Sequence, residues 1–485
     1  MRVVAPFHIV VVGVSVLKFC KLMRHVQAEC GYRVSYVVAS STDVHALLAN
    51  GVSAADVRHI DERLSIPAPS AQDIEYLANL ERGEVPTVHN MIQSDPVISK
   101  LPYADALAYA AHLARGFRSA FSALQPSVVI GGHDRMHSSM GFGVAKAEGF
   151  PWFCTNFSAV PIGLVGLSLG IFPDELVHLR DRPAGEAEAL AVSVLTHFEQ
   201  RRLKAPAYVS AYNLALVANR FRHHGIEAVR SLWARSTGRF DRYNDYSVWF
   251  KAKQYIRKRK NMLRLPHAWF IAKPPAEPFL FFGLHMQPES TPDVYAPFFA
   301  NQFDVIEKIA RAMPPTHQFL VKLHISDADN YSRKQLRSLL RLPGVQLVLP
   351  NVSSREFIDN CDAVVTIAGT IGLEAALLGK PVIIFGKMNY NRMPSVERVG
   401  DIYDLPALIR RALSRPKPKR EAIIAAFAKH LSDYFETLCF DAPVRTDDWT
   451  LVEPAASELK GFVDLFQALA DYLARAPEAS SAVAP

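Results

Sequence analysis

Short apolar runs alternate with amphipathic stretches over roughly the first 195 residues of the chain. Each run is short enough for a buried strand, whereas the stretches between them repeat apolar residues at helical spacing. Strands are predicted at residues 9–12, 34–38, 127–131 and 152–155, and helices at residues 17–29, 104–124 and 138–148. Strands that alternate with helices predict a doubly wound, mostly parallel α/β sheet.

The same alternation returns from about residue 278 onward. Strands are predicted at residues 279–282, 318–322, 345–349, 363–367 and 382–385, and helices at residues 304–312, at residues 371–378 and from residue 354. After residue 407 the pattern is helical apart from a loop at residues 441–448. This part of the chain therefore predicts a second sheet of the same class.

The two blocks are joined by a segment without a strand-like run, residues 191–260, in which helical spacing fits best. The expected fold is α/β, with two Rossmann-like lobes facing a cleft, a helical insert and a helical C-terminal tail. We place the first lobe at residues 1–195, the basic helical insert at 196–275, the second lobe at 276–415, and the C-terminal helices with a frayed end at 416–485.

Cysteine usage and hydropathy exclude several classes of protein. The five cysteines are scattered and form no Cys-x-x-Cys pair, which argues against a disulfide scaffold or a zinc site and fits a reducing cytosol. The apolar residues 3–16 lack the cleavage site of a signal peptide, so we interpret them as containing the first buried strand. Residues 151–173 carry no charge, but a proline and three glycines interrupt them, so we interpret them as a loop-rich segment. We expect a cytosolic protein.

The net charge of +7 is concentrated in one segment. Residues 201–270 hold 16 Lys and Arg and three acidic residues, a net charge of +13. Because the total is +7, the rest of the chain has a net charge of −6. Such a distribution does not indicate a nucleic-acid-binding protein. The densest part is either a solvated helix face or a contact with anionic lipid or an anionic glycolipid acceptor. Its cations are Lys251, Lys253, Arg257, Lys258, Arg259 and Lys260.

Polar, cationic or glycine-rich turns follow the predicted strands of the second block, where ligands of open parallel sheets bind. Gly369 and Thr370 lie between a strand and a helix, so backbone N–H groups, the positive end of the helix dipole and the Thr370 hydroxyl form a candidate anion site. Glu374 lies one turn further along the same helix face and is placed to accept hydrogen bonds from ribose hydroxyls. The alternative is an ordinary turn with a capping Thr370 and a solvated Glu374.

Two other strand ends in this block add donors and charge. Lys322 and His324 lie on the same side of one strand end, so together they place positive charge and donors at the same anion. The alternative is a surface histidine beside a solvated lysine. Gln287 and Glu289 also share one side of the chain, with Pro288 fixing the backbone between them, although such a turn in isolation is an ordinary loop.

Three motifs in the second block occur in the order and spacing of a known family. They are His285-Met-Gln-Pro-Glu289, Val321-Lys-Leu-His324, and the glycine-rich residues 366–386 followed by Tyr390. Residues 278–395 thereby resemble the capsule polysaccharide biosynthesis and export family, whose members have GT-B-like glycosyltransferase folds and include β-Kdo transferases. One departure is Ile325, which replaces the proline that usually follows the histidine and removes a rigid turn beside the phosphate.

The resemblance implies a nucleotide-sugar donor in the second lobe and an acceptor in the first. In GT-B-like folds, protein cations and a helix N-terminus stabilise the departing phosphate, so we expect no metal and no cofactor. The residues that the resemblance and the strand ends assign to the donor are His285, Gln287, Lys322, His324, Gly369, Thr370 and Glu374.

Sugar transfer also needs a base that takes the proton of the acceptor hydroxyl. At the carboxyl end of the predicted strand 127–131, a turn with glycines carries His133 and Asp134 toward the expected cleft. We choose Asp134 over His133 because a carboxylate also stabilises positive charge that develops on the donor sugar. Glu289, from the opposite wall, is the reserve candidate. The alternative is that Asp134 only caps the helix that follows.

We interpret the chain as a glycosyltransferase of a bacterial capsular or other surface polysaccharide or glycolipid, cytoplasmic and peripheral at the inner membrane. The resemblance to β-Kdo transferases includes CMP-Kdo among the candidate donors. Two alternatives share the architecture: a nucleotide-sugar epimerase, which needs no acceptor, and a polyol-phosphate transferase. A third is a non-catalytic subunit of polysaccharide assembly. The retained Lys322, His324, Thr370 and Glu374 argue against this third alternative, whereas Ile325 argues for it.

Overall fold

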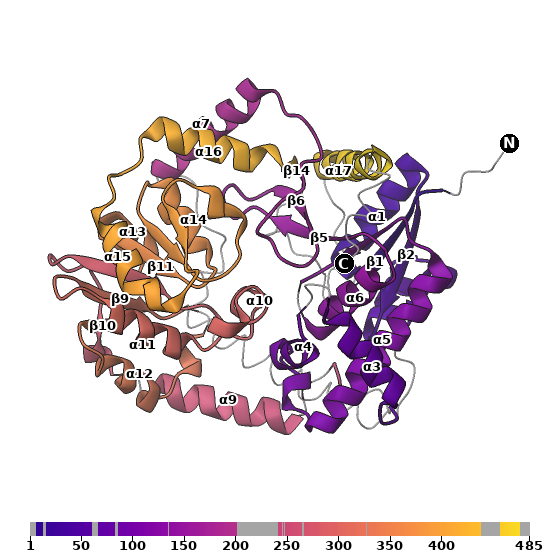
Figure 1. Cartoon of the computed structure of the whole chain (residues 1–485), viewed down its shortest axis with the longest axis horizontal. Helices are drawn as coiled ribbons and strands as arrows, with labels where there is room; N and C mark the ends of the chain where they lie inside the picture. Colours follow the sequence, from indigo (N-terminus) through magenta and orange to yellow (C-terminus); the bar gives the residue numbers. More distant parts are fainter. Residues whose placement is uncertain are drawn as a thin grey trace. The chain divides into compact units, whose positions relative to one another are not determined.

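The computed structural model of the chain describes residues 6–12, 16–60, 66–82, 86–133, 135–200, 241–244, 246, 248–263, 266–325, 327–437 and 456–475. They form two compact units, shown in Figure 1. Unit 1 comprises Met1–Pro183 together with Ser432–Pro485, and unit 2 comprises Ala184–Leu431. Unit 1 is therefore discontinuous in sequence, because its last part follows unit 2 along the chain.

Unit 1 is built on a seven-stranded sheet with the order β14-β6-β5-β4-β1-β2-β3. The strands are β1 (His8–Val12), β2 (Arg33–Val38), β3 (Val57–His59), β4 (Val128–Gly131), β5 (Trp152–Phe157), β6 (Leu164–Leu169) and β14 (Phe435–Glu436). Strands β1 to β5 are parallel, whereas β6 pairs antiparallel with both β5 and β14. The parallel strands follow the Rossmann order, which reverses between β1 and β4.

Helices of unit 1 connect these strands and bury one face each. They are α1 (Val16–Cys30), α2 (Ser41–Ala49), α3 (Ala71–Leu80), α4 (Val88–Ser94), α5 (Tyr103–Leu124), α6 (Arg135–Ala147) and α17 (Ala456–Arg475), with short 3-10 turns η1 (Ala54–Asp56) and η2 (Ile98–Lys100). In α5, for example, Tyr109, Leu113 and Phe117 are four residues apart and almost fully buried. This spacing produces the apolar stripe that α5 turns toward the core.

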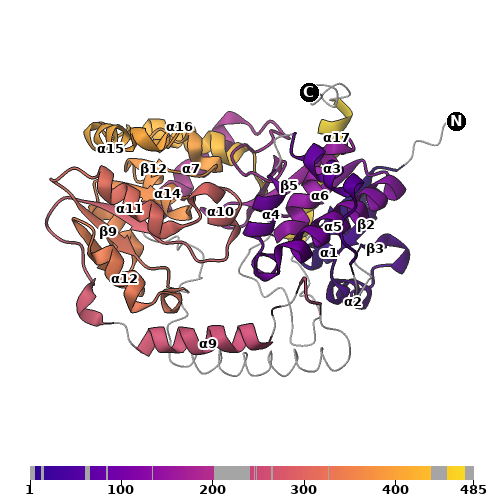
Figure 2. The same ribbon diagram turned by 60° about the horizontal axis from the view of Figure 1, so that its bottom comes forward.

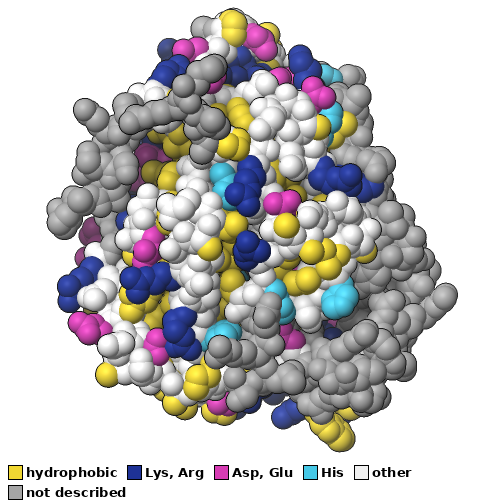
Figure 3. All heavy atoms as spheres, turned by 90° about the vertical axis from the view of Figure 1, so that its right-hand side faces the viewer, with side chains coloured by type: hydrophobic (Ala, Val, Ile, Leu, Met, Phe, Trp, Pro, Cys, Tyr) yellow, Lys and Arg dark blue, Asp and Glu magenta, His cyan; other side chains and the backbone are white. Residues whose placement is uncertain are grey.

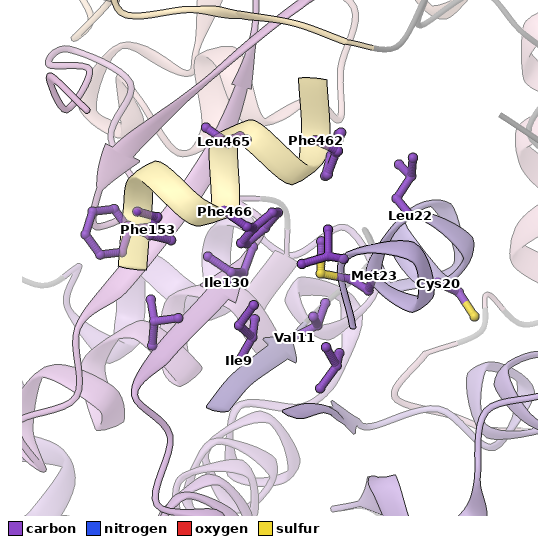
Figure 4. Packing of buried hydrophobic residues seen from close by; sticks show 14 of the residues in the cluster. Ile9, Val11, Cys20, Leu22, Met23, Ile130, Phe153, Phe462, Leu465 and Phe466 are labelled. Atoms are coloured by element: carbon purple, nitrogen blue, oxygen red, sulfur yellow. The ribbon is translucent and has the colours of Figure 1, made fainter. Parts of the chain in front are cut away.

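Helix α17 completes the core of unit 1, as Figure 4 shows. Its buried side chains lie three or four residues apart and share one hydrophobic cluster with Ile9 of β1 and Ile130 of β4. They are Phe462, Leu465, Phe466 and Leu469, each with 0% exposure. Gly461 allows a close approach, because a Cβ atom there would lie 1.7 Å from the carbonyl oxygen of Glu436 in β14. Helix α17 is thus part of the fold of unit 1, although it follows unit 2 along the chain.

Unit 2 is built on a second seven-stranded sheet, with the order β13-β12-β11-β8-β9-β10-β7 and all pairs parallel. The strands are β7 (Phe270–Ile271), β8 (Phe279–Gly283), β9 (Gln318–Lys322), β10 (Val345–Val348), β11 (Ala363–Thr366), β12 (Val382–Ile384) and β13 (Val396–Arg398). The central strands are continuous apolar runs because helices cover both faces of such sheets. Here the order reverses between β8 and β11, which marks the expected ligand edge.

Nine α-helices are described in unit 2, with α9 at its edge, away from the sheet (Figure 2). They are α7 (Ala184–Glu199), α9 (Val248–Leu263), α10 (Ser290–Asp293), α11 (Gln302–Ala312), α12 (Arg333–Leu340), α13 (Ser354–Asn360), α14 (Thr370–Leu377), α15 (Leu405–Ser414) and α16 (Arg420–Ser432). The 3-10 turns are η3 (His267–Trp269), η4 (Pro297–Phe299), η5 (Ala328–Asn330), η6 (Asn389–Arg392) and η7 (Ile402–Asp404). None of the helices in the described ranges is both long and apolar enough to cross a membrane.

The predicted fold class is confirmed: the chain has two Rossmann-like α/β units and a helical C-terminal part, as in GT-B-like folds. One local prediction is wrong. The strand predicted at residues 152–155 is β5, but the rest of residues 151–173, expected to be loop-rich, contains β6. Pro161 and Gly163 lie in the connection between the two strands, whereas Gly166 lies within β6 and Gly170 follows it. The predicted loop 441–448, the frayed end from residue 476 and most of the basic insert (201–240) lie outside the described residues.

Candidate functional site

His285 joins the two strands at which the order of the second sheet reverses. It follows β8, and its buried Nε2 atom lies 3.4 Å from the backbone nitrogen of Ala368 and 3.4 Å from Oγ1 of Thr366, both at the end of β11. Burial, and to a smaller extent the neighbouring His324, lowers the pKa of His285 to about 3. The ring is therefore neutral at pH 7 and accepts the Ala368 N–H, so it fixes the two strand ends to each other.

Gln287 uses its side-chain amide to hold the loop after β8 in place. Its Nε2 donates to Asp293 Oδ1 and to the Ala300 carbonyl, both at 2.9 Å. Gln302, at the start of α11, donates to Gln287 Oε1 at 2.9 Å and to the His285 carbonyl at 3.0 Å. Two predicted donor-site residues, Gln287 and His285, are thus linked by Gln302, a residue that the strand-end pattern did not identify.

Glu289 is the last residue of this loop, and Asp327 contacts the loop from the segment after β9. Glu289 is half-buried, and its backbone N–H donates to Asp293 Oδ2 at 3.1 Å. Asp327, in the loop after β9, accepts the Gln287 N–H at 3.3 Å. Burial raises the pKa of Asp327 to about 6, while Lys258 opposes this shift. The structure therefore adds Asp327 to the site, and its only signal in the sequence is its place a few residues beyond β9.

Lys322 and His324 come together with His285 and Glu374, as the strand-end pattern predicts. Lys322 is 9% exposed, and its Nζ donates to the Pro350 carbonyl at 3.0 Å. Burial lowers the pKa of Lys322 to about 8, against the effect of Glu374. Burial and the Lys322 charge also lower the pKa of the half-buried His324 below 6.5. At pH 7 the positive charge of the site therefore comes from Lys322, and His324 is a neutral hydrogen-bonding group.

The turn before α14 brings backbone donors to the same edge of the sheet. Gly369 is the N-cap residue, and no side chain caps the helix, so Thr370 is exposed at the first helical position without acting as the cap. The Gly369 N–H donates to Thr366 Oγ1 at 3.2 Å, and the Tyr390 hydroxyl donates to the Gly369 carbonyl at 2.5 Å. A Cβ atom at residue 369 would lie 3.0 Å from His285 Cε1, so this position favours glycine. The first turn of α14 leaves N–H groups available to an anion.

Glu374 is a half-buried carboxyl one turn into α14. Burial raises its pKa to about 7, although Arg355 and Lys322 both lower it. Arg355, which sequence reasoning missed, is held by Asp359 Oδ1 at 2.8 Å and by the Phe198 carbonyl at 3.1 Å. The pKa of Glu374 therefore lies near neutral pH, so the carboxyl group can either accept a hydrogen bond from a hydroxyl group or donate one to it.

In unit 1, the turn after β4 carries the predicted base. Asp134 lies outside the described residues. His133 is half-buried, and its Nδ1 lies 3.2 Å from the Cys154 sulfur of β5. Arg135, the next described residue, has φ of 68°, a conformation that costs a non-glycine residue on the order of 1 kcal/mol. Strain of this kind persists only where surrounding contacts hold it.

Asp95 supplies those contacts. Its fully buried carboxylate accepts the backbone N–H groups of Val97 at 2.9 Å and Ile98 at 3.0 Å, which fixes it in the loop after α4. The same carboxylate accepts Met136 N–H at 3.1 Å and Arg135 Nε at 3.3 Å, at the start of α6. Although burial opposes it, the nearby Arg135 and His137 lower the pKa of Asp95. Asp95 therefore ties the loop after α4 to the start of α6, close in sequence to His133.

Gly131, at the end of β4, owes its identity to packing. A Cβ atom there would lie 1.8 Å from Cζ2 of Trp152, so only glycine lets the indole ring cover this position. The sequence interpretation, in which the glycine gives a substrate access to the backbone, is therefore not needed to explain Gly131. Among the residues of the described ranges, no group of three or more His, Cys, Asp or Glu is arranged to hold a metal ion.

The predicted basic cluster lies on α9 and is divided between two faces of that helix. Lys258 lies 3.6 Å from Asp329 Oδ1, and Lys251 is half-buried. Lys253, Arg257 and Lys260 are exposed, whereas the side chain of Arg259 lies outside what the structure describes. The cluster is therefore partly structural, because one of its cations helps to attach α9 to unit 2.

Comparison with known sequences confirms the family resemblance over part of the chain. The family described as capsule polysaccharide biosynthesis protein matches residues 298–433, which include Lys322, His324 and the turn before α14. Protein FixF of Sinorhizobium fredii (strain NBRC 101917 / NGR234) is 29% identical over 133 residues, or 27% of this chain. The aligned region spans about a third, 32%, of that relative.

The solved structures that are similar to this chain at low identity include a transferase and an epimerase. The β-Kdo 2,4-transferase KpsC of Thermosulfurimonas dismutans is 13% identical with a TM-score of 0.34, over 70% of this chain and 87% of that chain. The UDP-GlcNAc 2-epimerase of Neisseria meningitidis, solved with UDP-GlcNAc, is 12% identical with a TM-score of 0.30, over 87% and 97% of the two chains. Likenesses this low carry no argument about the activity of this chain.

Proposed function

We propose that the protein is a glycosyltransferase that moves a sugar from a nucleotide-sugar donor to a bacterial capsular or other surface polysaccharide or glycolipid. The family match over residues 298–433 supports a role in capsule polysaccharide synthesis. The observation that carries the proposal is the convergence of Lys322, His324, Glu374 and the turn before α14 at one edge of the second sheet. A buried cation, backbone donors and a carboxyl group suit a nucleotide diphosphate or monophosphate and its ribose.

Each group of this edge has a proposed role. The Lys322 ammonium and the N–H groups at the start of α14 bind the phosphate and stabilise its charge as the sugar departs. His324 donates a further hydrogen bond, and Glu374 accepts one from a ribose hydroxyl. His285 and Gln287 act through the loop that they hold in place. In this scheme the protein's own cation and helix N-terminus take the part of a metal, so the proposal invokes neither metal nor cofactor.

Ligand binding tests the donor site directly. A ligand that binds only the folded state raises its stability, so thermal-shift measurements with CMP-, UDP-, GDP- and CDP-linked sugars identify the nucleotide. The resemblance to capsular β-Kdo transferases makes CMP-Kdo the first donor to try. The proposal predicts that one nucleotide raises the melting temperature and that sugar release requires an acceptor. A changed sugar without acceptor indicates an epimerase, and no stabilisation by any nucleotide indicates a non-catalytic assembly subunit.

The base belongs to unit 1 in this proposal. Asp134 takes the proton of the acceptor hydroxyl, with His133 as its neighbour in the same turn and Glu289 of unit 2 as the reserve. Asp134→Asn keeps the shape and removes the base, so turnover is expected to fall ~100-fold or more while nucleotide affinity is unchanged. Normal turnover in Asp134→Asn, together with loss of activity in Glu289→Gln, would assign the base to unit 2 instead.

The place of action follows from the acceptor. A growing surface polysaccharide or its lipid carrier is available at the cytoplasmic face of the inner membrane, so we expect a cytoplasmic enzyme that works there as a peripheral protein. Cell fractionation tests this, since a peripheral protein is recovered with membranes at low salt and released at high salt.

A further inference from the structure

One face of α9 is used for packing within unit 2. The Lys258 ammonium lies 3.6 Å from Asp329 Oδ1, and Asn261 Nδ2 donates to the Asp329 carbonyl at 3.1 Å, so η5 holds the C-terminal half of the helix. The helix from Val248 to Leu263 contains no Asp or Glu that would neutralise its cations. These contacts fix the orientation of the helix and turn the face opposite Lys258 away from η5.

That opposite face combines exposed apolar and basic side chains. Trp249, Lys253, Ile256 and Lys260 follow one another at intervals of three or four residues, which places them on one side of a helix, with Arg257 beside them. Trp249 is 81% exposed and Ile256 is 54% exposed. Within the described part of the chain, Lys253, Arg257 and Lys260 form no ion pair or hydrogen bond. Five side chains of α9 are thus exposed to solvent, while the side of the helix that carries Lys258 contacts η5.

The combination of exposed apolar and basic side chains distinguishes a lipid surface from a polyanion as the binding partner. A polyanion such as a nucleic acid or an acidic polysaccharide is attracted by cations alone, and exposed isoleucine adds little to that attraction. An anionic lipid surface binds both the apolar and the basic side chains. Indole rings and aliphatic side chains enter the headgroup region, while Lys and Arg contact the anionic headgroups. Another face of the protein, shown in Figure 3, instead mixes basic and acidic side chains. The chemistry of the α9 face therefore favours an anionic membrane.

We propose that the α9 face formed by Trp249, Lys253, Ile256, Arg257 and Lys260 docks the protein on a membrane that contains anionic lipids. Lys258 and Lys251 are not part of this contact, because the first is paired and the second is half-buried. The inference gives the expected peripheral location a defined surface. It does not depend on the sugar-transfer chemistry, since membrane binding is measured without donor or acceptor.

Co-sedimentation of the full chain with vesicles tests the proposal. The vesicles are phosphatidylcholine alone or phosphatidylcholine mixed with phosphatidylglycerol. Binding is expected only with the anionic lipid and is expected to fall with added salt. Replacing Lys253, Arg257 and Lys260 by Gln should lower the partition coefficient roughly 100-fold, from ~1 kcal/mol per cation and tenfold per 1.4 kcal/mol. Trp249→Ser should lower it about tenfold and leave the salt dependence in place.

A matched variant controls for charge. Lys273, Lys417 and Lys419 are exposed elsewhere in unit 2, and their replacement by Gln removes the same charge without touching α9. This control should bind as the wild type does, and all variants should melt at the same temperature because the replaced side chains are exposed. Equal recovery on neutral vesicles, or unchanged binding of the α9 variant, would overturn the proposal. Binding to heparin that matches vesicle binding and survives Trp249→Ser would overturn it in favour of a polyanionic ligand.

Discussion

A single physical cause, burial at the strand ends of unit 2, shifts the ionisation of four side chains at once. It lowers the pKa values of His285, Lys322 and His324 and raises that of Glu374. Each shift disfavours the charged form, as desolvation does. Burial therefore reduces the net charge that these side chains carry. A phosphate bound beside Lys322 would stabilise its protonated amine. Phosphate binding and proton binding at Lys322 are therefore coupled.

The first prediction is a pH dependence of nucleotide affinity. Lys322 loses its proton as the pH rises through about 8 in the free protein, well below the usual 10.5. Because a phosphate favours the protonated amine, the dissociation constant should be flat near pH 7 and should rise by up to tenfold per pH unit above pH 8. Lys322→Met should weaken binding at pH 7 by about 1.5–3 kcal/mol and abolish this dependence. Titration calorimetry from pH 7 to pH 9 measures both effects.

The control for this prediction is Lys308→Met on α11, where the cation is paired with Asp304 on the helix surface. That variant should keep both the affinity and the pH dependence of the wild type. If the wild type binds its nucleotide equally well at pH 7 and pH 9, Lys322 is not the phosphate cation.

At the scale of elements, long helices such as α1 and α5 and central strands such as β8 could be predicted because each carries several apolar residues in a regular pattern. Helices α2, α3 and α4 lie outside the predicted elements. The short edge strands β13 and β14 could not be predicted, since runs of three and two residues have no period and form through their neighbours. The strand-end rule singled out Lys322 and Glu374 as candidate site residues. The rule did not identify Asp95 or Arg355. Each contacts residues that are distant in sequence, and such long-range contacts cannot be inferred from a local sequence pattern.

Asp95 gives the second prediction. Its carboxylate joins the loop after α4 to the start of α6, so Asp95→Ala leaves buried N–H groups and Arg135 without their acceptor. The free energy of unfolding of unit 1 should fall by about 3–5 kcal/mol, measured by urea denaturation. Because the pKa of Asp95 is lowered in the folded state, its stabilising effect should be present at neutral pH and lost as the pH falls below 3.8.

The matched control for Asp95 is Glu75→Ala, which removes an exposed carboxylate from α3 of the same unit. It should change the stability by less than about 0.5 kcal/mol. A similar small effect in Asp95→Ala would show that the turn after β4 is held by other contacts.

At the scale of the whole molecule, the chain builds unit 1 from its two ends and unit 2 from its middle. The order of elements along the sequence does not reveal this, because α17 reads as one more amphipathic helix at the end of the chain. Only the three-dimensional structure shows that α17 belongs to unit 1, because its apolar side chains pack in the core beside β1 and β4 (Figure 4). Four fully buried side chains at about 1.5–3 kcal/mol each amount to a large part of the 5–15 kcal/mol that stabilises a typical domain.

The third prediction follows from this arrangement. Leu465→Ala combined with Phe466→Ala should cost unit 1 about 5–10 kcal/mol through the cavities left in its core, enough to unfold it. Unit 2 is continuous in sequence and contains none of these side chains, so it should stay folded and keep its nucleotide affinity. Calorimetry should show one lost transition, and limited proteolysis should leave a fragment close to residues 184–431. Lys460→Ala, at an exposed position of α17, is the control and should change neither result. If both units unfold together in the core variant, or if nucleotide binding disappears with unit 1, the donor site is not a property of unit 2 alone.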